Sequence, residues 1–316
     1  MKNVQKKITK DFFNKVAGEW FERTYDPAGD YLKFPVNKSR KDVALLEIDG
    51  LNLPKSALAM DIGCGTGQLV IDLIGRGYNA HGIDIADKMI AEAKEHLSEA
   101  KIKNKGVFRI SDLADLSKGD KRYSLVTALG LLEYLATDEE LFFVLKKIVN
   151  RNGYALVECR NRLFNLFSGN KYTIDICQSG QLKNLVSSFD HVENFSPIPI
   201  SETPKLQKKV FSEISQFLNG PSNYEDWKKT TKKEYSKYPF TMVRRQHTPQ
   251  ELDFTANEFG FKLEYVVYYH LHPYLPRYEE FFPKIYNKIS EIMTPLGRTS
   301  LGASSGSAFV GVLKKK

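Results

Sequence analysis

The chain has 316 residues, with 46 Lys and Arg against 38 Asp and Glu, a formal charge of +8 and a pI near 9.1. Its hydrophobic content of 42% is enough to bury a core, which excludes a disordered or collagen-like polymer. At about 150 residues per domain, the length predicts two units, or one α/β domain with a large insertion.

Three cysteines, Cys64, Cys159 and Cys177, lack the C-x-x-C spacing of a zinc ribbon and do not suggest a disulfide framework. They favour a reducing, cytoplasmic setting. The stretch from Met1 to Lys10 has charges but no apolar h-region, and no segment approaches the ~18 apolar residues of a spanning helix. We therefore expect neither secretion nor membrane insertion.

From residue 57 onward, short apolar segments alternate with segments of helical spacing. Strands are expected at 57–64, 79–85, 105–110, 123–129 and 153–159, and helices at 68–76, from 87 onward and at 138–150. Asn152-Gly153 is expected to stop the last of these helices. Strands alternating with helices predict a mainly parallel sheet that is covered on both faces.

The alternation breaks between Asn161 and His247. This segment holds 13 Lys and Arg and 8 Asp and Glu, a balance of 13 − 8 = +5 within the total of +8. Regular units resume at Thr248-Pro249-Gln250-Glu251, which reads as a capping box with proline at the first helical position. A helix is expected through Phe259 with a stop at Gly260, followed by a strand at 261–269, a helix at 278–293 and a final strand at 307–313.

The sharpest motif, Asp61-Ile62-Gly63-Cys64-Gly65-Thr66-Gly67, lies between the first strand and the first helix of this series. Its glycines let the backbone turn tightly and approach a ligand, and amides at a helix start favour electron-rich atoms. The spacing is G-x-G-x-G rather than the dinucleotide pattern G-x-G-x-x-G, and a phosphate-loop lysine is missing. Asp84, 17 residues after Gly67, ends the second strand, where a carboxylate can accept hydrogen bonds from ribose hydroxyls.

This run resembles the first motif of the class I S-adenosylmethionine-dependent methyltransferases, closely over 57–158 and more loosely over 248–313. The resemblance implies an α/β, Rossmann-like fold with a mainly parallel seven-stranded sheet, helices on both faces, an antiparallel last strand and a large insertion after strand 5. It also implies S-adenosyl-L-methionine as cofactor and S-adenosyl-L-homocysteine as product. The implied cofactor-binding residues are Gly63 and Gly65 close to the methionyl part, Asp61 at the turn and the amino group, Asp84 at the ribose, Asp112 and Leu113 at the adenine edge, and Leu129 and Gly130 beside the sulfonium, together with Gly67 and Ile85. The alternative is a tight strand-helix turn with Asp84 and Asp112 as helix caps, and for Asp112 an ordinary turn is equally reasonable.

Ligands of open parallel sheets lie outside the carboxyl ends of the strands, so these ends predict the acceptor site. Three of them are polar: Glu133-Tyr134, the run from Glu158 to Arg162, and the run from His270 to Tyr274. The candidate catalytic residues are His270, His272 and Tyr134. Alternation along a strand places both histidines on one face, where one could act as general base and the other as its positioning partner. A pair of structural histidines is the alternative, and without a third ligand they do not indicate a metal site.

Basic residues bracket the irregular segment, and both of its ends must return to the same side of the sheet. Guanidinium groups bind phosphate or carboxylate in a bidentate manner, so we expect a small anionic acceptor that is phosphorylated, nucleotide-linked or sugar-derived. The expected acceptor-binding residues are Glu133, Arg160, Arg162, Arg244, Arg245 and His247. A solvated basic face is the alternative for any single arginine.

The domain plan follows from these elements: an N-terminal helical lid region at 1–56, a methyltransferase core at 57–160 and 248–316, and an insertion or substrate lid at 161–247. Aromatic residues from Phe12 to Tyr31 resemble the lid of small-molecule methyltransferases, or else pack a helix onto the core. The runs 160–167, 270–276 and 307–310 look like methyltransferases of bacterial surface-polysaccharide and modified-sugar pathways.

Two rival functions stay open. An RNA or protein methyltransferase would use the basic insertion, including the lysines at 228, 229, 232 and 233, to bind a polymer, although acidic neighbours make nucleic acid the weaker choice. A cofactor-binding regulator without turnover is the second rival. An oligomer remains possible, because the sequence does not fix the number of subunits.

Overall fold

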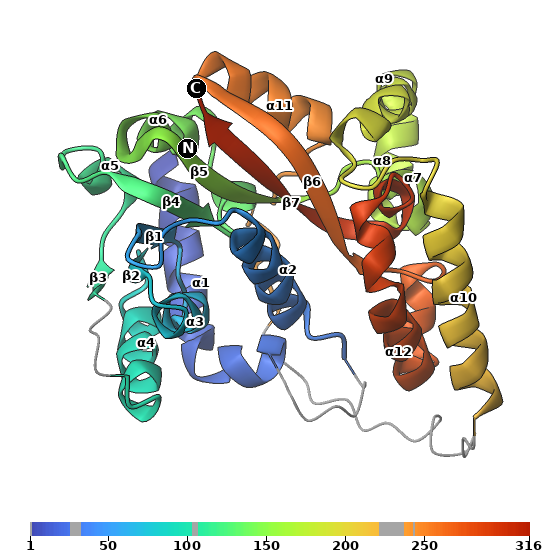
Figure 1. Ribbon diagram of the computed structural model, residues 1–316, viewed down its shortest axis with the longest axis horizontal. Helices are drawn as coiled ribbons and strands as arrows, with labels where there is room; N and C mark the ends of the chain where they lie inside the picture. Colours follow the sequence, from blue (N-terminus) through green and yellow to red (C-terminus); the bar gives the residue numbers. More distant parts are fainter. Residues whose placement is uncertain (1, 26–32, 103–106, 221–236, 243) are drawn as a thin grey trace.

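The computed structural model describes residues 2–25, 33–102, 107–220, 237–242 and 244–316. Its centre is one sheet of seven strands in the order β3-β2-β1-β4-β5-β7-β6, which crosses the molecule in Figure 1. The strands are β1 (Leu58–Ile62), β2 (Asn79–Asp84), β3 (Val107–Ile110), β4 (Tyr123–Ala128), β5 (Val149–Arg160), β6 (Phe261–Leu271) and β7 (Gly306–Lys315). The first five pair in parallel, whereas β7 runs antiparallel between β5 and β6. The expected Rossmann-like fold with a mainly parallel sheet and an antiparallel last strand is confirmed.

Helices cover both faces of the sheet. One face packs against α2 (Val36–Gly50), α3 (Gln68–Gly75) and α4 (Asp87–Glu99), around a core that includes Leu125, Leu156 and Val310. The other face packs against α6 (Glu139–Ile148) and α11 (Pro249–Glu258), around Val126, Val157 and Phe309. Alternate residues of a strand point to opposite faces, so each buried strand supplies both cores.

The first helix, α1 (Lys2–Tyr25), lies against α4 and α2 near the carboxyl ends of the parallel strands (Figure 1). None of the described helices combines the length and the apolar character needed to cross a bilayer.

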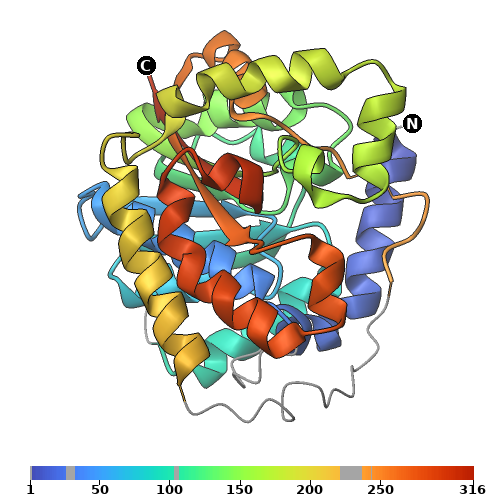
Figure 2. The same ribbon diagram turned by 90° about the vertical axis from the view of Figure 1, so that its right-hand side faces the viewer.

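The segment between β5 and α11 is mostly helical in its described part. It contains α7 (Asn165–Ser168), α8 (Lys171–Gln178), α9 (Leu182–Ser187), the 3-10 segment η2 (Ser188–Phe195) and α10 (Thr203–Asn219). Figure 2 shows α10 beside α12 (Pro283–Met293). Apolar residues of α8, α9 and α10 belong to the core of the α6–α11 face, so the segment packs as part of the main body. The lysines at 228–233 and Tyr31 lie outside the described residues.

Several element boundaries differ from the sequence-based expectation. The helix expected at 138–150 ends at Ile148, because Val149 already pairs with Tyr123 and begins β5; Asn152-Gly153 therefore lies inside the strand. The helix expected at 278–293 is two pieces, the 3-10 turn η4 (Pro276–Glu280) and α12. Pro283 begins α12, and a proline both lacks the amide hydrogen and restricts the residue before it, which separates the two pieces.

The start of α11 agrees with its sequence pattern. The Thr248 hydroxyl accepts a hydrogen bond from the Glu251 amide at 3.1 Å, and the Glu251 carboxylate accepts one from the Thr248 amide at 2.8 Å. This is the expected capping box with Pro249 at the first helical position, and it sets the point where the regular fold resumes. The remaining short elements are α5 (Leu113–Leu116), η1 (Leu132–Tyr134), η5 (Thr294–Arg298) and α13 (Gly302–Ser305).

Candidate active site

A cavity of about 600 Å³ opens at the carboxyl ends of β1, β2, β4 and β5. One end is lined by the glycine turn after β1 and by the end of β2, and the other by β5, β6 and the start of β7. Helices α1 and α2 form much of the remaining wall. The position agrees with the rule that ligands of open α/β sheets bind outside the carboxyl ends of the strands.

The glycine turn has the backbone geometry that its sequence suggests. Gly63, Gly65 and Gly67 have φ values of +74°, +52° and +84°, where residues with a side chain are strained. At Gly67 a Cβ would also lie 2.7 Å from the Phe108 ring, whereas at Gly65 the nearest atom to a Cβ would be Trp20 Nε1 at 3.9 Å. Gly67 is therefore needed for packing, and Gly63 and Gly65 leave backbone facing the cavity.

Asp84 at the end of β2 holds this turn. Its Oδ2 accepts a hydrogen bond from the Gly65 amide at 3.0 Å, and its Oδ1 accepts one from the Ala86 amide at 2.8 Å. Burial raises the pKa of this carboxyl, while hydrogen bonds from the backbone of Ala86, Gly65 and Ile85 lower it. A carboxylate has about four lone-pair sites, so Asp84 can still accept a hydrogen bond from a ligand. Asp84 and Ile85 both line the cavity.

Asp61 lies near the end of β1, next to the glycine turn. It is buried and accepts a hydrogen bond from the Thr127 hydroxyl at 2.7 Å, and it does not line the cavity. Burial raises its pKa to about 7, although the Thr127 bond acts in the opposite direction. It stabilises β1 against β4 beneath the turn. Gly67 and Leu129 also lie outside the cavity lining, whereas Gly130 belongs to it.

Asp112 and Leu113 line the cavity beyond β3. Asp112 caps α5 by accepting the Asp115 amide at 3.0 Å, and its other oxygen pairs with Lys6 of α1. The cap that the sequence left as an alternative reading is present, and the same carboxylate still faces the cavity. Lys6 thereby fastens the start of α1 over this part of the site.

Aromatic residues of α1 close the cavity on the solvent side. Phe13 meets Trp20 and Tyr134 edge-to-face, each with ring centroids 5.3 Å apart. The three side chains line the cavity. Burial raises the pKa of Tyr134 well above its ordinary value, so its phenol is protonated at neutral pH.

At the far end, Arg40 of α2 lies between the sheet and the cavity. Its Nη1 is 3.7 Å from Glu158 Oε2, and Glu158 Oε1 accepts a hydrogen bond from the Tyr269 hydroxyl at 2.9 Å. A Cβ at Gly130 would lie 2.1 Å from the same guanidinium, so the glycine after β4 makes room for Arg40. Burial raises the pKa of Glu158, an effect that Arg40 opposes.

Two arginines converge on Glu133 in the 3-10 turn after β4. Arg244 Nε donates to Glu133 Oε2 at 2.9 Å, and Arg160 Nε is 3.8 Å from the same oxygen. Burial alone would raise the pKa of Glu133, but these two guanidinium groups lower it below its ordinary value. Arg244 also stacks on Tyr238 at 4.4 Å, and Arg23 of α1 lies 5.2 Å from that ring.

The two histidines are neighbours but have different surroundings. Their ring centroids are 4.2 Å apart, yet only His270 lines the cavity. His270 Nδ1 hydrogen-bonds the Ser307 hydroxyl at 2.9 Å, and its ring stacks on Phe34 at 4.3 Å. His272 stacks on Phe164 at 4.8 Å and hydrogen-bonds the Tyr286 hydroxyl at 2.9 Å.

The backbone of His270 has a rare conformation. His270 has φ +50°, which a residue with a side chain seldom adopts, and such strain is typically found at functional sites. Burial lowers the pKa of His270 well below its ordinary value and that of His272 to about 3. Both imidazoles are therefore neutral at neutral pH.

The remaining predicted acceptor-binding residues lie outside the cavity lining. Arg245 donates to the Leu135 carbonyl at 2.8 Å and pairs with Asp138 at 2.5 Å. His247 Nε2 contacts the same carboxylate at 2.9 Å, and Arg162 pairs with Glu251 of α11. Asn161 and His247 form a β-bridge, so the two ends of the insertion do meet, as expected, but only Arg160 and Arg244 face the cavity.

Several cavity residues were missed by sequence reasoning. Arg40 comes from α2, within the region 1–56 that the sequence analysis treats only as a helical lid, and its one signal is its place on the buried side of that helix, between Asn37 and Ala44. Arg23 and Tyr238 had no recognisable spacing to the motif. Within the described ranges, no three His, Cys, Asp or Glu side chains gather in a way that would hold a metal ion.

Comparison with known proteins agrees with this architecture. A family model described as a methyltransferase domain matches residues 59–153, which contain the glycine turn, Asp84, β1 from its second residue onward and strands β2 to β4. This part of the chain is therefore similar to a methyltransferase domain, and its sheet has the Rossmann-like fold.

Two curated relatives make the resemblance more specific. A magnesium-protoporphyrin O-methyltransferase of Synechocystis sp. is 33% identical over 141 residues, which are 42% of this chain and 59% of the relative. A ubiquinone biosynthesis O-methyltransferase of Dechloromonas aromatica is 28% identical over 157 residues, which are 48% of this chain and 62% of the relative. The chain thus spans about three fifths of the length of each relative.

The crystal structure of the magnesium protoporphyrin IX methyltransferase of Synechocystis PCC 6803, with bound SAH, covers 99% of this chain at 18% identity, with a TM-score of 0.51. The match includes 100% of that chain and shows that the fold is shared. The names of these relatives do not refer to surface polysaccharides, so the resemblance to that pathway stays a prediction.

Proposed function

We propose that this chain is an S-adenosyl-L-methionine-dependent methyltransferase that acts on a small, negatively charged acceptor in the cytoplasm. The observation that carries the proposal is a single cavity that joins the glycine turn and Asp84 to Arg160, Arg244 and His270. A cofactor end and an acceptor end in one enclosure are what a group transfer between two small molecules requires.

The cofactor end has the donors and acceptors that a nucleoside with a charged amino-acid tail needs. Asp84 has lone pairs for the ribose hydroxyls, and Gly63 and Gly65 present bare backbone to the methionyl part. Asp112 and Leu113 border the place for the adenine, with Ile85 beside the ribose. Asp61, Gly67 and Leu129 lie outside the cavity lining and contribute indirectly, by holding the glycine turn and the end of β4 in place.

S-adenosyl-L-methionine supplies an electrophilic methyl carbon, whose bond to sulfur breaks as the acceptor oxygen bonds to it, leaving S-adenosyl-L-homocysteine. The role of this chain is to align that oxygen and take its proton. His270 Nε2 is the base we assign, because its Nδ1 is held by Ser307 and its imidazole is neutral. His272 and Phe34 position the ring, and the protonated Tyr134 helps to exclude water.

The charge of the acceptor end favours an anion. Arg40, Arg160 and Arg244 face Glu133 and Glu158 there, a balance of 3 − 2 = +1 in a buried setting. Arg160 and Arg244 are already drawn together by Glu133, which preorganises them for a phosphate or carboxylate. A phosphorylated, nucleotide-linked or otherwise sugar-derived molecule carries such a group. The helical insertion would border the acceptor and limit its size.

The test is transfer of label from methyl-labelled S-adenosyl-L-methionine into a host extract that is then separated into acid-soluble and acid-precipitated fractions. Label in the acid-soluble fraction is expected. Label in the precipitate would instead support the RNA or protein methyltransferase, and cofactor binding without any label would support the non-catalytic regulator.

A further inference from the structure

Among the buried side-chain atoms that have no hydrogen-bond partner, three belong to residues at the acceptor end of the cavity. They are Glu158 Oε2, Arg160 Nε and His270 Nε2. Buried polar groups without partners cost free energy, and proteins rarely keep them unless a ligand or water completes them. Three such atoms from neighbouring strand ends indicate groups held ready for a ligand.

The strand register brings the three residues to the same end of the cavity. Glu158 and Arg160 are two residues apart on β5, so their side chains share the face that packs against α2. Arg160 pairs with Ala308 of β7, which pairs in turn with Tyr269 of β6, the residue before His270. The Tyr269 hydroxyl reaches across β7 to Glu158 Oε1, so the cavity ends of β5 and β6 are in direct contact.

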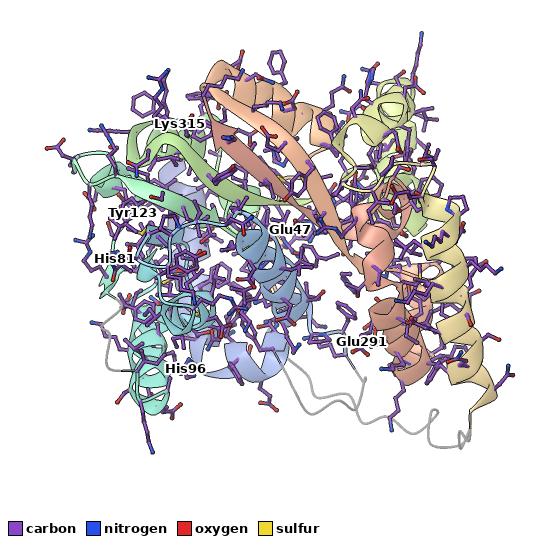
Figure 3. The ribbon with its side chains drawn as sticks, in the orientation of Figure 1. Glu47, His81, His96, Tyr123, Glu291 and Lys315 are labelled. Carbon is purple, nitrogen blue, oxygen red and sulfur yellow. The ribbon has the colours of Figure 1, made fainter. Side chains whose placement is uncertain are left out.

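Glu158 can be compared with Glu47, a second buried glutamate that contacts a tyrosine and an arginine, and the two differ in how many of their oxygens have partners. Glu47 of α2, labelled in Figure 3, is 2% exposed, accepts the Tyr265 hydroxyl at 2.9 Å on one oxygen and pairs with Arg298 through the other. Glu158 is 3% exposed and has the same kind of tyrosine bond, but its second oxygen is only within 3.7 Å of Arg40 and makes no hydrogen bond. Glu47 also lies outside the cavity lining. A purely structural carboxylate is satisfied, as Glu47 is, whereas Glu158 belongs to the cavity lining and has one buried oxygen without a hydrogen bond.

We propose that Glu158 is a specificity-determining residue that accepts a hydrogen bond from a second hydroxyl or amino group of the acceptor, adjacent to the hydroxyl that His270 deprotonates. Arg160 Nε donates to an oxygen of the same molecule. The acceptor we propose is a vicinal diol or amino alcohol that also carries a negative charge. This inference rests on the proposed methyltransferase function and narrows its acceptor class.

The chemistry of the three atoms supports a donor-bearing acceptor rather than a simple acid. A carboxylate oxygen repels a second anion, so an acceptor with acidic groups alone would leave Glu158 unpaired when it binds. A hydroxyl or amino hydrogen satisfies that oxygen, while the acidic group of the acceptor pairs with the arginines. Sites that read a substrate hydroxyl through a buried polar group reject analogues that lack it strongly.

The first experiment compares Glu158→Gln with Glu47→Gln, using the acid-soluble fraction of host extract as the source of acceptor. Glutamine keeps the size but turns an amide hydrogen toward the acceptor when Tyr269 holds its oxygen. We expect Glu158→Gln to raise the half-saturating extract concentration by about 10- to 100-fold, as for loss of a charged hydrogen bond. The dissociation constant of S-adenosyl-L-methionine should stay unchanged, and Glu47→Gln should change neither quantity.

A second variant and a chemical treatment guard against a folding effect. Tyr269→Phe keeps the carboxylate but frees Oε1, so a smaller rise in the half-saturating concentration is expected; the urea unfolding midpoint of this variant, measured in parallel, shows any loss of stability from the unpaired oxygen. Periodate cleaves vicinal diols and amino alcohols, so extract treated with periodate and quenched should lose most of its acceptor capacity with the wild-type enzyme.

Unchanged half-saturation in Glu158→Gln, or full acceptor capacity after periodate, would overturn the inference while leaving methyl transfer intact. A wild-type protein that transfers no label to any fraction would instead refute the proposed function, and this inference with it.

Discussion

The carboxylate of Asp84 joins the glycine turn to the cavity. It bonds the amides of Gly65 and Ala86 and keeps lone pairs for a ligand. We expect Asp84→Asn to weaken binding of S-adenosyl-L-methionine by about 10- to 100-fold, because an amide loses the charge that strengthens hydrogen bonds to ribose hydroxyls. Isothermal titration calorimetry measures the dissociation constant.

The matched control for this prediction is Asp49→Asn. Asp49 pairs with Arg76 at 3.1 Å and lies outside the cavity lining, so the same chemical change should leave cofactor affinity as it is. Equal affinities of the two variants would contradict a ribose contact at Asp84.

The burial of His270 leads us to expect an unusual pH dependence of methyl transfer. Burial lowers its pKa well below 6.5, so the imidazole stays neutral, and able to take a proton, below the pH at which an ordinary histidine is protonated. We therefore expect kcat/KM for the acceptor to stay level between about pH 6 and 8, and His270→Gln to lower kcat by about 10²- to 10⁴-fold. The pH-rate profile of label transfer measures this.

An acid limb near pH 6.5 that disappears in His270→Gln would show an ordinary pKa and contradict the burial argument. Wild-type kcat in His270→Gln would exclude His270 as the base, in which case Tyr134 or positioning alone remains.

At the scale of elements, the basic residues at the two ends of the insertion have different partners and different roles. Arg160 and Arg244 face the cavity and Glu133, whereas Arg245 and His247 hold Asp138 at the start of α6. These two partners lower the pKa of Asp138, although burial acts to raise it, so the cluster stabilises the joint between insertion and core.

Arg244→Ala and Arg245→Ala should therefore behave differently. We expect the first to raise the half-saturating acceptor concentration at least about tenfold, because it removes one guanidinium from the anion site. The second should lower the free energy of unfolding by about 1–3 kcal/mol, because Asp138 loses a charged partner, with little effect on acceptor binding. Label transfer and urea unfolding separate the two effects, and identical behaviour of the variants would contradict the division.

Helix starts were the most predictable elements. The capping box at Thr248 and the glycine turn before α3 depend on bonds between residues close in sequence, so the pattern contains the whole interaction. The end of α6 was predicted wrongly because Val149 pairs with Tyr123, 26 residues earlier, and a long-range strand pairing overrides the local signal.

At the scale of the whole molecule, the buried histidines couple folding to pH. His272 has a pKa of about 3 in the folded chain, below its ordinary value of 6.5, so the unfolded chain binds the proton first as the pH falls. The stability that this residue contributes is fully present above about pH 6.5 and is lost as the pH falls toward 3.

Buried carboxyls with raised pKa values change stability in the opposite direction as the pH falls, but they are present in both wild type and His272→Gln. The difference between these two proteins therefore isolates the contribution of His272. Below pH 6.5, the free energy of unfolding of the wild type should fall relative to that of His272→Gln by about 1 kcal/mol per pH unit. Urea unfolding at pH 7, 6 and 5 measures it. A constant difference across this range would mean that His272 titrates alike in the folded and unfolded chain.

The sequence by itself determined the order of strands and helices, the glycine turn and the acid at the end of β2, because periodicity, turn chemistry and capping act over a few residues. It also placed Glu133, Arg160 and His270 at strand ends that face a common edge. Only the tertiary structure decided which basic residues face the cavity, that Arg40 enters it from α2, and that His270 rather than His272 lines it. Those outcomes depend on strand register, helix placement and one residue with positive φ, and none of these is encoded in the spacing of neighbouring residues.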